Sequence, residues 1–201
     1  MPNWCDGYLV ITGPPADIKK FKRFAKEPGK DGQLLDANKF IPYPKKFQKL
    51  DEKYQKQFSK EESLRNKENY YDMDDYQKRY FDFLNPRKSW EMRDGYNRGG
   101  YEWCVSNWGS KWNFCRVSLT EDITEEDTSS LEYSFESAWS PLVPVVAKMA
   151  EMFPTLCFEY KYAEPGIGFI GLLYCENGKV MIDDCHDMTP EEYAEWCGEE
   201  Y

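Results

Sequence analysis

The residues best suited to chemistry in this sequence are tryptophans that stand beside lysine, asparagine or glycine. An indole ring offers a large flat face and one N–H donor, so it can stack on a planar ligand. Lys111 could then pair with an anionic group, and the run Glu164–Gly168 could bring backbone N–H groups close to it. The candidate ligand-binding residues are Trp4, Asn107, Trp108, Lys111, Trp112, Trp139, Glu164, Gly166 and Gly168.

A second interpretation of the same tryptophans is structural. Buried aromatic side chains dominate the energetics of protein cores, so the rings could simply close one end of a sheet. We favour this interpretation on sequence alone. The Gly166-Ile167-Gly168 run is a weak signal for a ligand, because it lacks both the strand–GxGxxG–helix context and the GK[ST] of a P-loop.

No group of residues in the sequence indicates a catalytic reaction. The single histidine, His186, lies in the run Asp183–Asp187, but consecutive residues seldom converge on one metal ion. Its neighbour Cys185 is a poor candidate nucleophile, since catalytic Cys and His usually come from different elements. The acidic run Thr120–Asp127 lacks the calcium-loop pattern. We therefore expect no catalytic residue, no metal site and no cofactor, with an unrecognised hydrolase or nuclease as the remaining enzyme hypothesis.

The elements that would position these residues alternate between strand and helix patterns. Apolar and β-branched runs predict strands, and apolar residues at helical spacing predict amphipathic helices. Ser140 and Pro141 are expected to begin the second helix, as cap and first helical residue. The expected strands are 8–12, 113–119, 131–135, 156–162, 169–174 and 179–182, and the expected helices are 16–26 and 141–153.

This order predicts an α+β fold with a ferredoxin-like split βαβ antiparallel sheet and an extra C-terminal strand. Both helices should cover the same face. We expect the candidate residues to lie near one another at one end of the sheet: Trp4, Trp108, Lys111, Trp112, Trp139 and the turn Glu164–Gly168. We also expect the first and third strands to point the same way, which by itself would place Trp139 at the opposite edge of the domain from Trp4. The second strand and the fourth should run against them.

The segment 45–95 differs in character and is predicted to be a helical insertion. Its apolar residues recur every three or four positions within highly charged sequence, which indicates amphipathic helices. Gly95–Gly100 is expected to be a flexible connection, and residues 183–201 an acidic tail, all within one domain of 1–201. The insertion should pack through Phe47, Tyr54, Phe58, Tyr76 and Tyr80.

Charge and cysteine content restrict the location and the partners. No apolar run approaches the roughly 18 residues that a membrane span needs, and the start lacks a signal-peptide pattern. The seven cysteines include no C-x-x-C pair, so we expect reduced thiols in the cytoplasm and no membrane partner. Residues 121–201 carry 3 basic and 19 acidic side chains, which would repel nucleic acid and attract basic partners.

Four segments of the sequence stand out together: 1–5, 107–112, 137–141 and 164–169. They resemble the YubB-type ferredoxin-like domain family, which is found in phages, plasmids and integrated elements. The resemblance implies the fold and a mobile-element setting but supplies no catalytic residues. The leading hypothesis is therefore a non-enzymatic accessory protein that binds a host protein, such as a defence component, through an acidic, nucleic-acid-like surface. The alternative is a protein that binds a small anionic, nucleotide-like ligand.

Overall fold

The structure is a computed structural model that describes residues 3–27, 33–124 and 129–198. The chain divides into two compact units, which we describe separately. The sheet unit comprises residues 1–42 and 103–201, and the helical unit comprises Tyr43–Glu102. Within the described ranges, no helix combines the length and the apolar character that crossing a membrane requires.

The sheet unit contains six strands in the order β2-β3-β1-β4-β5-β6, and each strand is antiparallel to its neighbours. This confirms the predicted α+β fold, with the sixth strand added at the edge. The strands are β1 (Trp4–Gly13), β2 (Cys115–Thr124), β3 (Ser129–Ala138), β4 (Cys157–Glu164), β5 (Phe169–Glu176) and β6 (Lys179–Asp187).

The expected directions of the second and third strands were wrong: β2 runs parallel to β1, and β3 runs against both. Trp4 at the start of β1 lies opposite Ala138 at the end of β3, so these two strands run against each other. In a split βαβ arrangement the strand that separates two parallel strands is antiparallel to both, and here β3 separates β1 from β2. The starts of β1 and β2 and the ends of β3 and β4 therefore meet at one end of the sheet.

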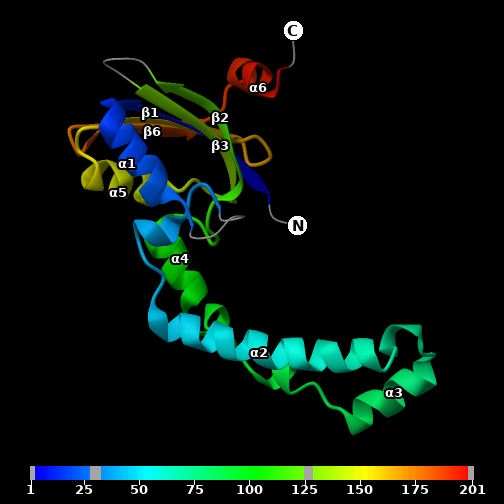
Figure 1. The fold of residues 1–201 in the computed structure, drawn as a ribbon. Helices are drawn as coiled ribbons and strands as arrows, with labels where there is room; N and C mark the ends of the chain where they lie inside the picture. Colours follow the sequence, from blue (N-terminus) through cyan, green and yellow to red (C-terminus); the bar gives the residue numbers. More distant parts are fainter. Residues whose placement is uncertain (1–2, 28–32, 125–128, 199–201) are drawn as a thin grey trace. The chain divides into compact units, whose positions relative to one another are not determined.

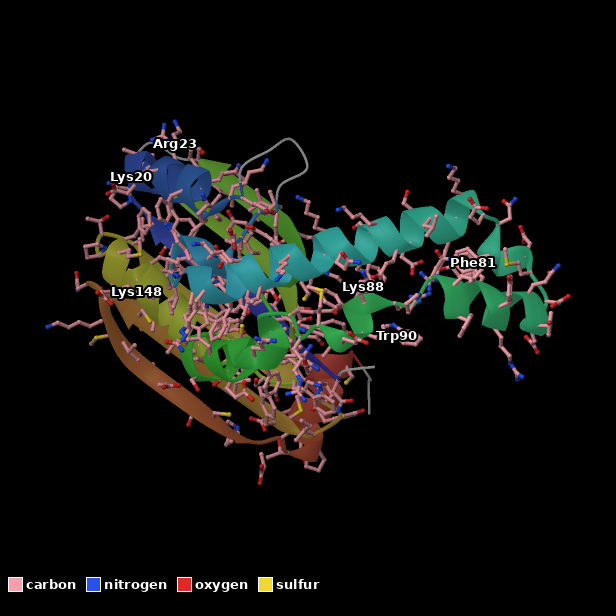
Figure 2. The ribbon with its side chains drawn as sticks, turned by 90° about the horizontal axis from the view of Figure 1, so that it is seen from below. Lys20, Arg23, Phe81, Lys88, Trp90 and Lys148 are labelled. Atoms are coloured by element: carbon pink, nitrogen blue, oxygen red, sulfur yellow. The ribbon has the colours of Figure 1, made fainter. Side chains whose placement is uncertain are left out.

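Two helices, α1 (Pro15–Ala25) and α5 (Val143–Met152), cover one face of the sheet (Figure 1). In α1 the buried residues Ile18, Phe21 and Ala25 share one side of the helix, while Lys20 and Arg23 point outward (Figure 2). The Phe21 ring meets the ring of Phe153 edge-on, 5.2 Å away between centroids. Both helices thus join one aromatic core, as the apolar spacing predicted.

The start of the second helix differs from the prediction. Helix α5 begins at Val143 without a side-chain cap, and Ser140 instead donates its hydroxyl to the Gly109 carbonyl at 2.6 Å. By contrast, the C-terminal helix α6 (Pro190–Cys197) begins with a Thr189 cap, whose hydroxyl accepts from the Glu192 N–H. This helix lies on the other face of the sheet (Figure 1). The described part of the acidic C-terminal segment, residues 183–198, thus forms the end of β6 and then α6.

The helical unit is built on α2 (Lys45–Lys67) and α3 (Asp75–Leu84), with short 3-10 turns at Tyr70–Asp72, Lys88–Glu91 and Tyr96–Arg98. Helix α4 (Gly100–Trp108) starts in this unit and continues into the sheet unit. The expected flexible connection Gly95–Gly100 is thus a 3-10 turn followed by a helix start. No residue of this unit belongs to the sheet.

The apolar residues of α3 do not pack as expected. Phe47 is buried, but Tyr76 and Tyr80 are 81% and 60% exposed. Phe81 is the inward residue of α3, and its ring lies 5.3 Å from that of Tyr70. Figure 2 shows Phe81 between α2 and α3. Tyr76 and Tyr80 share one side of the helix, and Phe81 faces away from that side.

Candidate functional site

The true strand direction brings three of the predicted tryptophans together. Trp4 begins β1, Trp112 precedes β2, and Trp139 directly follows β3, so all three lie at the same end of the sheet. The backbone N–H of Trp139 donates to the Asn3 carbonyl at 3.1 Å, which continues the β1–β3 ladder past its last pair. Trp139 has φ +71°, a left-handed conformation that is uncommon for a bulky residue.

Two cations lie against these indole rings. The Trp4 and Trp112 ring centroids are 6.0 Å apart. The Lys111 ammonium lies 4.4 Å from the Trp112 centroid and 5.8 Å from that of Trp139. Arg116 covers Trp4 at 5.1 Å. Cation–π contacts of this length are attractive, so the positive charges are held beside the rings. We call Trp4, Lys111, Trp112, Arg116 and Trp139 the tryptophan cluster; Trp112 and Trp139 remain 38% and 42% exposed.

The turn after β4 lies near this cluster but is closed on itself. A Cβ built on Gly166 would lie 3.1 Å from the Asn3 side-chain nitrogen, so the turn adjoins the start of β1. The buried Glu164 carboxylate accepts a hydrogen bond from the Ile167 N–H. The backbone carbonyl of Glu164 accepts one from the Gly168 N–H at 2.8 Å. Gly168 has φ +92°, which favours glycine. These two N–H groups are therefore engaged within the turn.

Asn107 and Trp108 belong to a different part of the molecule. Trp108 is buried, and its indole N–H donates to the Ile41 carbonyl at 2.8 Å. Its ring packs edge-on against Trp103 at 5.5 Å. The Asn107 amide donates to the Trp103 carbonyl, one turn earlier in α4. For these two residues the structural interpretation of the motif holds.

The face of the sheet opposite α1 and α5 carries a second candidate site, which the sequence did not reveal. Side chains alternate across each strand, so Leu9 and Ile11 point to the core while Tyr8 points away and is 52% exposed. Pairing with β1 places carboxylates of the neighbouring strands on the same side. We call this surface the acidic face; its carboxylates are Asp6, Glu121, Glu132, Glu136, Glu159 and Asp184.

Like charges stand directly opposite each other in two places on this face. Glu121 pairs with Glu132 across β2 and β3, and Asp6 pairs with Glu136 across β1 and β3. Burial, followed by the charge of Glu121, raises the pKa of Glu132. Burial is also the main cause of the raised pKa of Asp6; a hydrogen bond from Trp196 opposes the rise, and the charge of Glu136 adds to it. Opposed like charges destabilise a sheet, so structural stability alone does not explain this arrangement.

Positive charge on the acidic face is confined to its margins and one central lysine. Arg116 bridges to both Glu136 oxygens at 2.8 Å, and because it also covers Trp4, it joins the acidic face to the tryptophan cluster. Lys161 pairs with Glu159 at 3.0 Å. The remaining carboxylates give the face a negative potential that would attract cations and basic side chains.

Helix α6 covers part of the acidic face. Its Trp196 ring meets Tyr8 edge-on at 5.4 Å, and Glu192 accepts from His186 Nε2 at 3.0 Å. His186 Nδ1 lies 3.1 Å from Asp184. A pocket of about 280 Å³ lies between α6 and strands β4 to β6. It is lined by Lys161, Ile170, Gly171, Leu172, Asp184, His186, Glu192 and Trp196.

The pKa values of the His186–Glu192 pair shift in opposite directions. Hydrogen bonds to Glu192 and then Asp184 raise the pKa of His186. The Thr189 backbone N–H, followed by His186, lowers the pKa of Glu192 to about 2. This pair joins β6 to α6. Within the residues that the structure describes, no three or more His, Cys, Asp or Glu side chains gather as a metal would require.

Comparisons with known proteins found a family model that matches part of this chain. Residues 120–199 match the model of a family described as the ferredoxin-like domain in Api92-like protein. The crystal structure of a protein api92 from Yersinia pseudotuberculosis aligns with 94% of this chain and 100% of its own, at 11% sequence identity and a TM-score of 0.46. No curated protein matches the sequence. The match begins within β2 and continues through α6, so it supports a ferredoxin-like domain in the sheet unit.

Proposed function

We propose that this protein is a non-enzymatic binding protein whose acidic face docks a basic segment of a partner protein. The observation that carries the proposal is the pairing of Glu121 with Glu132. This pair places two carboxylates opposite each other, which costs folding stability. A bound Lys or Arg side chain would neutralise the repulsion between the carboxylates. A basic partner would therefore gain affinity from the relief of this repulsion.

The acidic face also carries the apolar contacts that a protein interface needs. Tyr8 and Ile182 are 52% and 45% exposed on the same side of the sheet as the carboxylates. Aromatic anchors supply much of the energy of protein interfaces, whereas charges mainly set specificity and association rate. An exposed tyrosine surrounded by carboxylates therefore suits a basic protein segment better than a nucleic acid, whose phosphates it would repel.

The biological setting in this proposal is that of a mobile-element accessory protein that acts on a host protein. What supports it is the sequence resemblance to a family of phage and plasmid proteins, together with the acidic face. A surface of closely spaced carboxylates imitates the charge of nucleic acid. A host defence protein with a nucleic-acid-binding surface would then be a fitting target, and the accessory protein would act as its inhibitor.

The test measures binding of a fluorescently labelled oligo-arginine peptide by anisotropy. The wild-type chain should bind it, with an affinity that falls as salt increases. The double variant Glu121→Gln/Glu132→Gln should bind more weakly by up to about 30-fold, since each charge contact is worth up to about 1 kcal/mol. The single variants Glu121→Gln and Glu132→Gln are compared with a matched control, Glu151→Gln on α5. The control changes the chain charge by the same amount as each single variant but lies on the opposite side of the sheet. Equal weakening of peptide binding by the single variants and the control would mean that only the net charge of the chain matters.

The second candidate is binding of a small, planar, anionic ligand at the tryptophan cluster. What favours it is the placement of Lys111 and Arg116 against three partly exposed indole rings. A nucleobase could stack on Trp112 or Trp139, and the two cations could meet its phosphates.

Calorimetry with a nucleoside triphosphate tests this second candidate. Trp112→Ala and Lys111→Ala should each abolish binding while the circular dichroism spectrum stays unchanged. Trp90→Ala is the control, because Trp90 is 75% exposed and belongs to the helical unit. Loss of binding with Trp90→Ala, or retention with Trp112→Ala, would contradict the role of the cluster.

A further inference from the structure

Helix α2 carries a row of lysines that the proposed function does not use. We call this row the lysine stripe; it consists of Lys46, Lys49, Lys53, Lys56 and Lys60. Their spacing alternates between three and four residues, so all five side chains project from one side of the helix. Every one of the five is exposed. At a rise of about 1.5 Å per residue, the stripe is about 21 Å long.

Three of the four carboxylates of α2 are directed away from this stripe, into the helical unit. Asp51 accepts a hydrogen bond from the Tyr96 backbone N–H at 3.0 Å. Glu61 is buried, and Glu62 forms an ion pair with Arg87 at 2.8 Å. The sequence of α2 therefore alternates in charge, but its folded position separates the charges onto different sides of the helix.

The fourth carboxylate does not neutralise the stripe either. Glu52 is exposed at its margin, three residues from Lys49 and four from Lys56. Among the residues that the structure describes, however, no ion pair engages a lysine of the stripe. The Lys46 ammonium lies 4.6 Å from the centroid of the Phe47 ring, a contact that leaves its positive charge in place. The stripe is thus a continuous line of positive charge.

This line of lysines costs helix stability. Like charges three or four residues apart repel each other on a helix surface. The first turn of α2 contains no acidic residue and begins with Lys45 and Lys46, although the positive end of the helix dipole favours carboxylates there. Folding of the helix alone does not account for this arrangement, which suggests that the lysines serve to bind an anionic partner.

The single sign of the charge favours nucleic acid over other anionic partners. A nucleic-acid backbone is a continuous line of negative charge, whereas protein surfaces usually intersperse both signs. A helix that lies on a membrane needs an apolar face buried in the lipid, but Phe47, on another side of α2, is already buried in the protein. The net negative charge also belongs to the sheet unit, because Tyr43–Glu102 carry 14 basic and 12 acidic side chains.

We propose that the lysine stripe of the helical unit binds the phosphate backbone of nucleic acid without reading its sequence. Lysine ammonium groups contact phosphate oxygens and release the counterions condensed on the backbone, which supplies most of the affinity of non-specific binding. Contacts to phosphates fix a position along the duplex but carry no base information. The stripe and the acidic face belong to different units of the chain, so this binding does not depend on the proposed function.

Fluorescence anisotropy with a labelled DNA duplex tests the proposal across a salt series. The wild type should bind the duplex, and the logarithm of its affinity should fall linearly with the logarithm of the salt concentration. The triple variant Lys49→Gln/Lys53→Gln/Lys56→Gln should reduce the size of this slope by about 2.7, because each lost phosphate contact removes about 0.9. Glutamine forms helices about as well as lysine, so circular dichroism should show unchanged helix content.

The matched control removes the same charge from another exposed basic helix. Lys19→Gln/Lys20→Gln/Arg23→Gln changes three exposed residues of α1 in the sheet unit. This variant should keep the wild-type slope. No binding of the duplex by the wild type, or an equal loss of slope in the two triple variants, would overturn the proposal.

A charge at the margin of the stripe gives a test in the opposite direction. Glu52→Gln should strengthen binding of the duplex, since it removes the carboxylate nearest to the lysines, while Glu151→Gln on α5 should leave binding unchanged. Vesicles that contain phosphatidylserine and an oligoglutamate peptide are the comparison probes. Binding of either probe as tight as that of the duplex, and equally sensitive to loss of the three stripe lysines, would overturn the assignment to nucleic acid.

Discussion

Glu132 of β3 lies directly opposite Glu121 of β2 on the acidic face, and the pKa of Glu132 is raised as a result of burial and of its neighbour's charge. The carboxylate pair is therefore a source of instability within an otherwise regular ladder. Proteins commonly keep such local costs where a surface serves binding rather than folding. The repulsion within this pair should therefore be measurable as a loss of folding stability in the free protein.

Replacing one member of the pair should stabilise the fold. We expect Glu132→Gln to raise the free energy of unfolding at pH 7 by about 0.2–1 kcal/mol, the usual scale of a cross-strand pair. Urea denaturation measures this change. Because the folded pKa of Glu132 lies above 4.5, the repulsion is absent below about pH 4.5 and present above the folded pKa. The advantage of the variant should thus disappear on acidification. A less stable variant at pH 7 would show that the carboxylate is structurally required.

The contact between β6 and α6 should depend on pH. His186 is the single histidine, so its ring gives one signal in a proton–carbon NMR titration. We expect this signal to titrate above pH 6.5, because Glu192 and Asp184 stabilise the charged ring. The raised pKa means that the contribution of His186 to stability is complete below pH 6.5 and is lost as the pH rises through the folded pKa.

Glu192 sets the acidic limit of the same contact. Its lowered pKa means that its contribution is present above pH 4.5 and is lost as the pH falls through about 2. Replacing Glu192 with Gln should move the His186 titration to lower pH, while Glu191→Gln, one residue away, should shift it far less. A His186 signal that titrates at or below 6.5 in the wild type would contradict the geometry.

The helical unit should be dispensable for folding of the sheet unit. We expect a chain in which a Gly/Ser linker replaces Tyr43–Glu102 to keep a cooperative unfolding transition, since the core residues Phe21, Phe135 and Tyr160 all lie in the sheet unit. Differential scanning calorimetry measures the transition. Global unfolding would show that the helices complete the core.

Most of the fold could be predicted from local sequence, because the spacing of apolar residues indicates where strands and helices lie. The prediction of β1 began at 8 rather than at Trp4, because Asp6 and Gly7 are poor strand formers. Gly7 is required there by the rings of Phe135 and Tyr160, which would lie within 3 Å of a Cβ. Those rings come from other strands, so no local pattern could reveal the constraint.

The candidate sites depended on strand direction and register, which local sequence does not determine. The wrong direction predicted for the third strand placed Trp139 and Trp4 at opposite edges of the domain, although the two residues lie at the same end of the sheet. The opposition of Glu121 and Glu132 likewise depends on register shifts in β2 that no sequence pattern predicted. On α3, the choice between Tyr80 and Phe81 as the inward residue is fixed by contacts with Tyr70 and Arg65.

The last prediction concerns Gly171 in the middle of β5. A Cβ at this position would lie 2.4 to 2.5 Å from three atoms of the Tyr162 side chain, which crosses the glycine from β4. Tyr162 is itself buried and packs against Tyr160 at 5.1 Å. Since this ring has little room to move, we expect Gly171→Ala to lower the free energy of unfolding by about 1–3 kcal/mol, the cost of overpacking a core.

A double-mutant cycle separates this clash from a backbone effect. Combining Gly171→Ala with Tyr162→Val should cost less than the sum of the two single changes, because the smaller side chain leaves space for the methyl group. Gly168→Ala is the comparison: its positive φ of +92° makes it costly, but no atom lies within 4 Å of the added Cβ. Its cost should therefore simply add to that of Tyr162→Val. Additivity at Gly171 as well would mean that Tyr162 does not determine the need for glycine there.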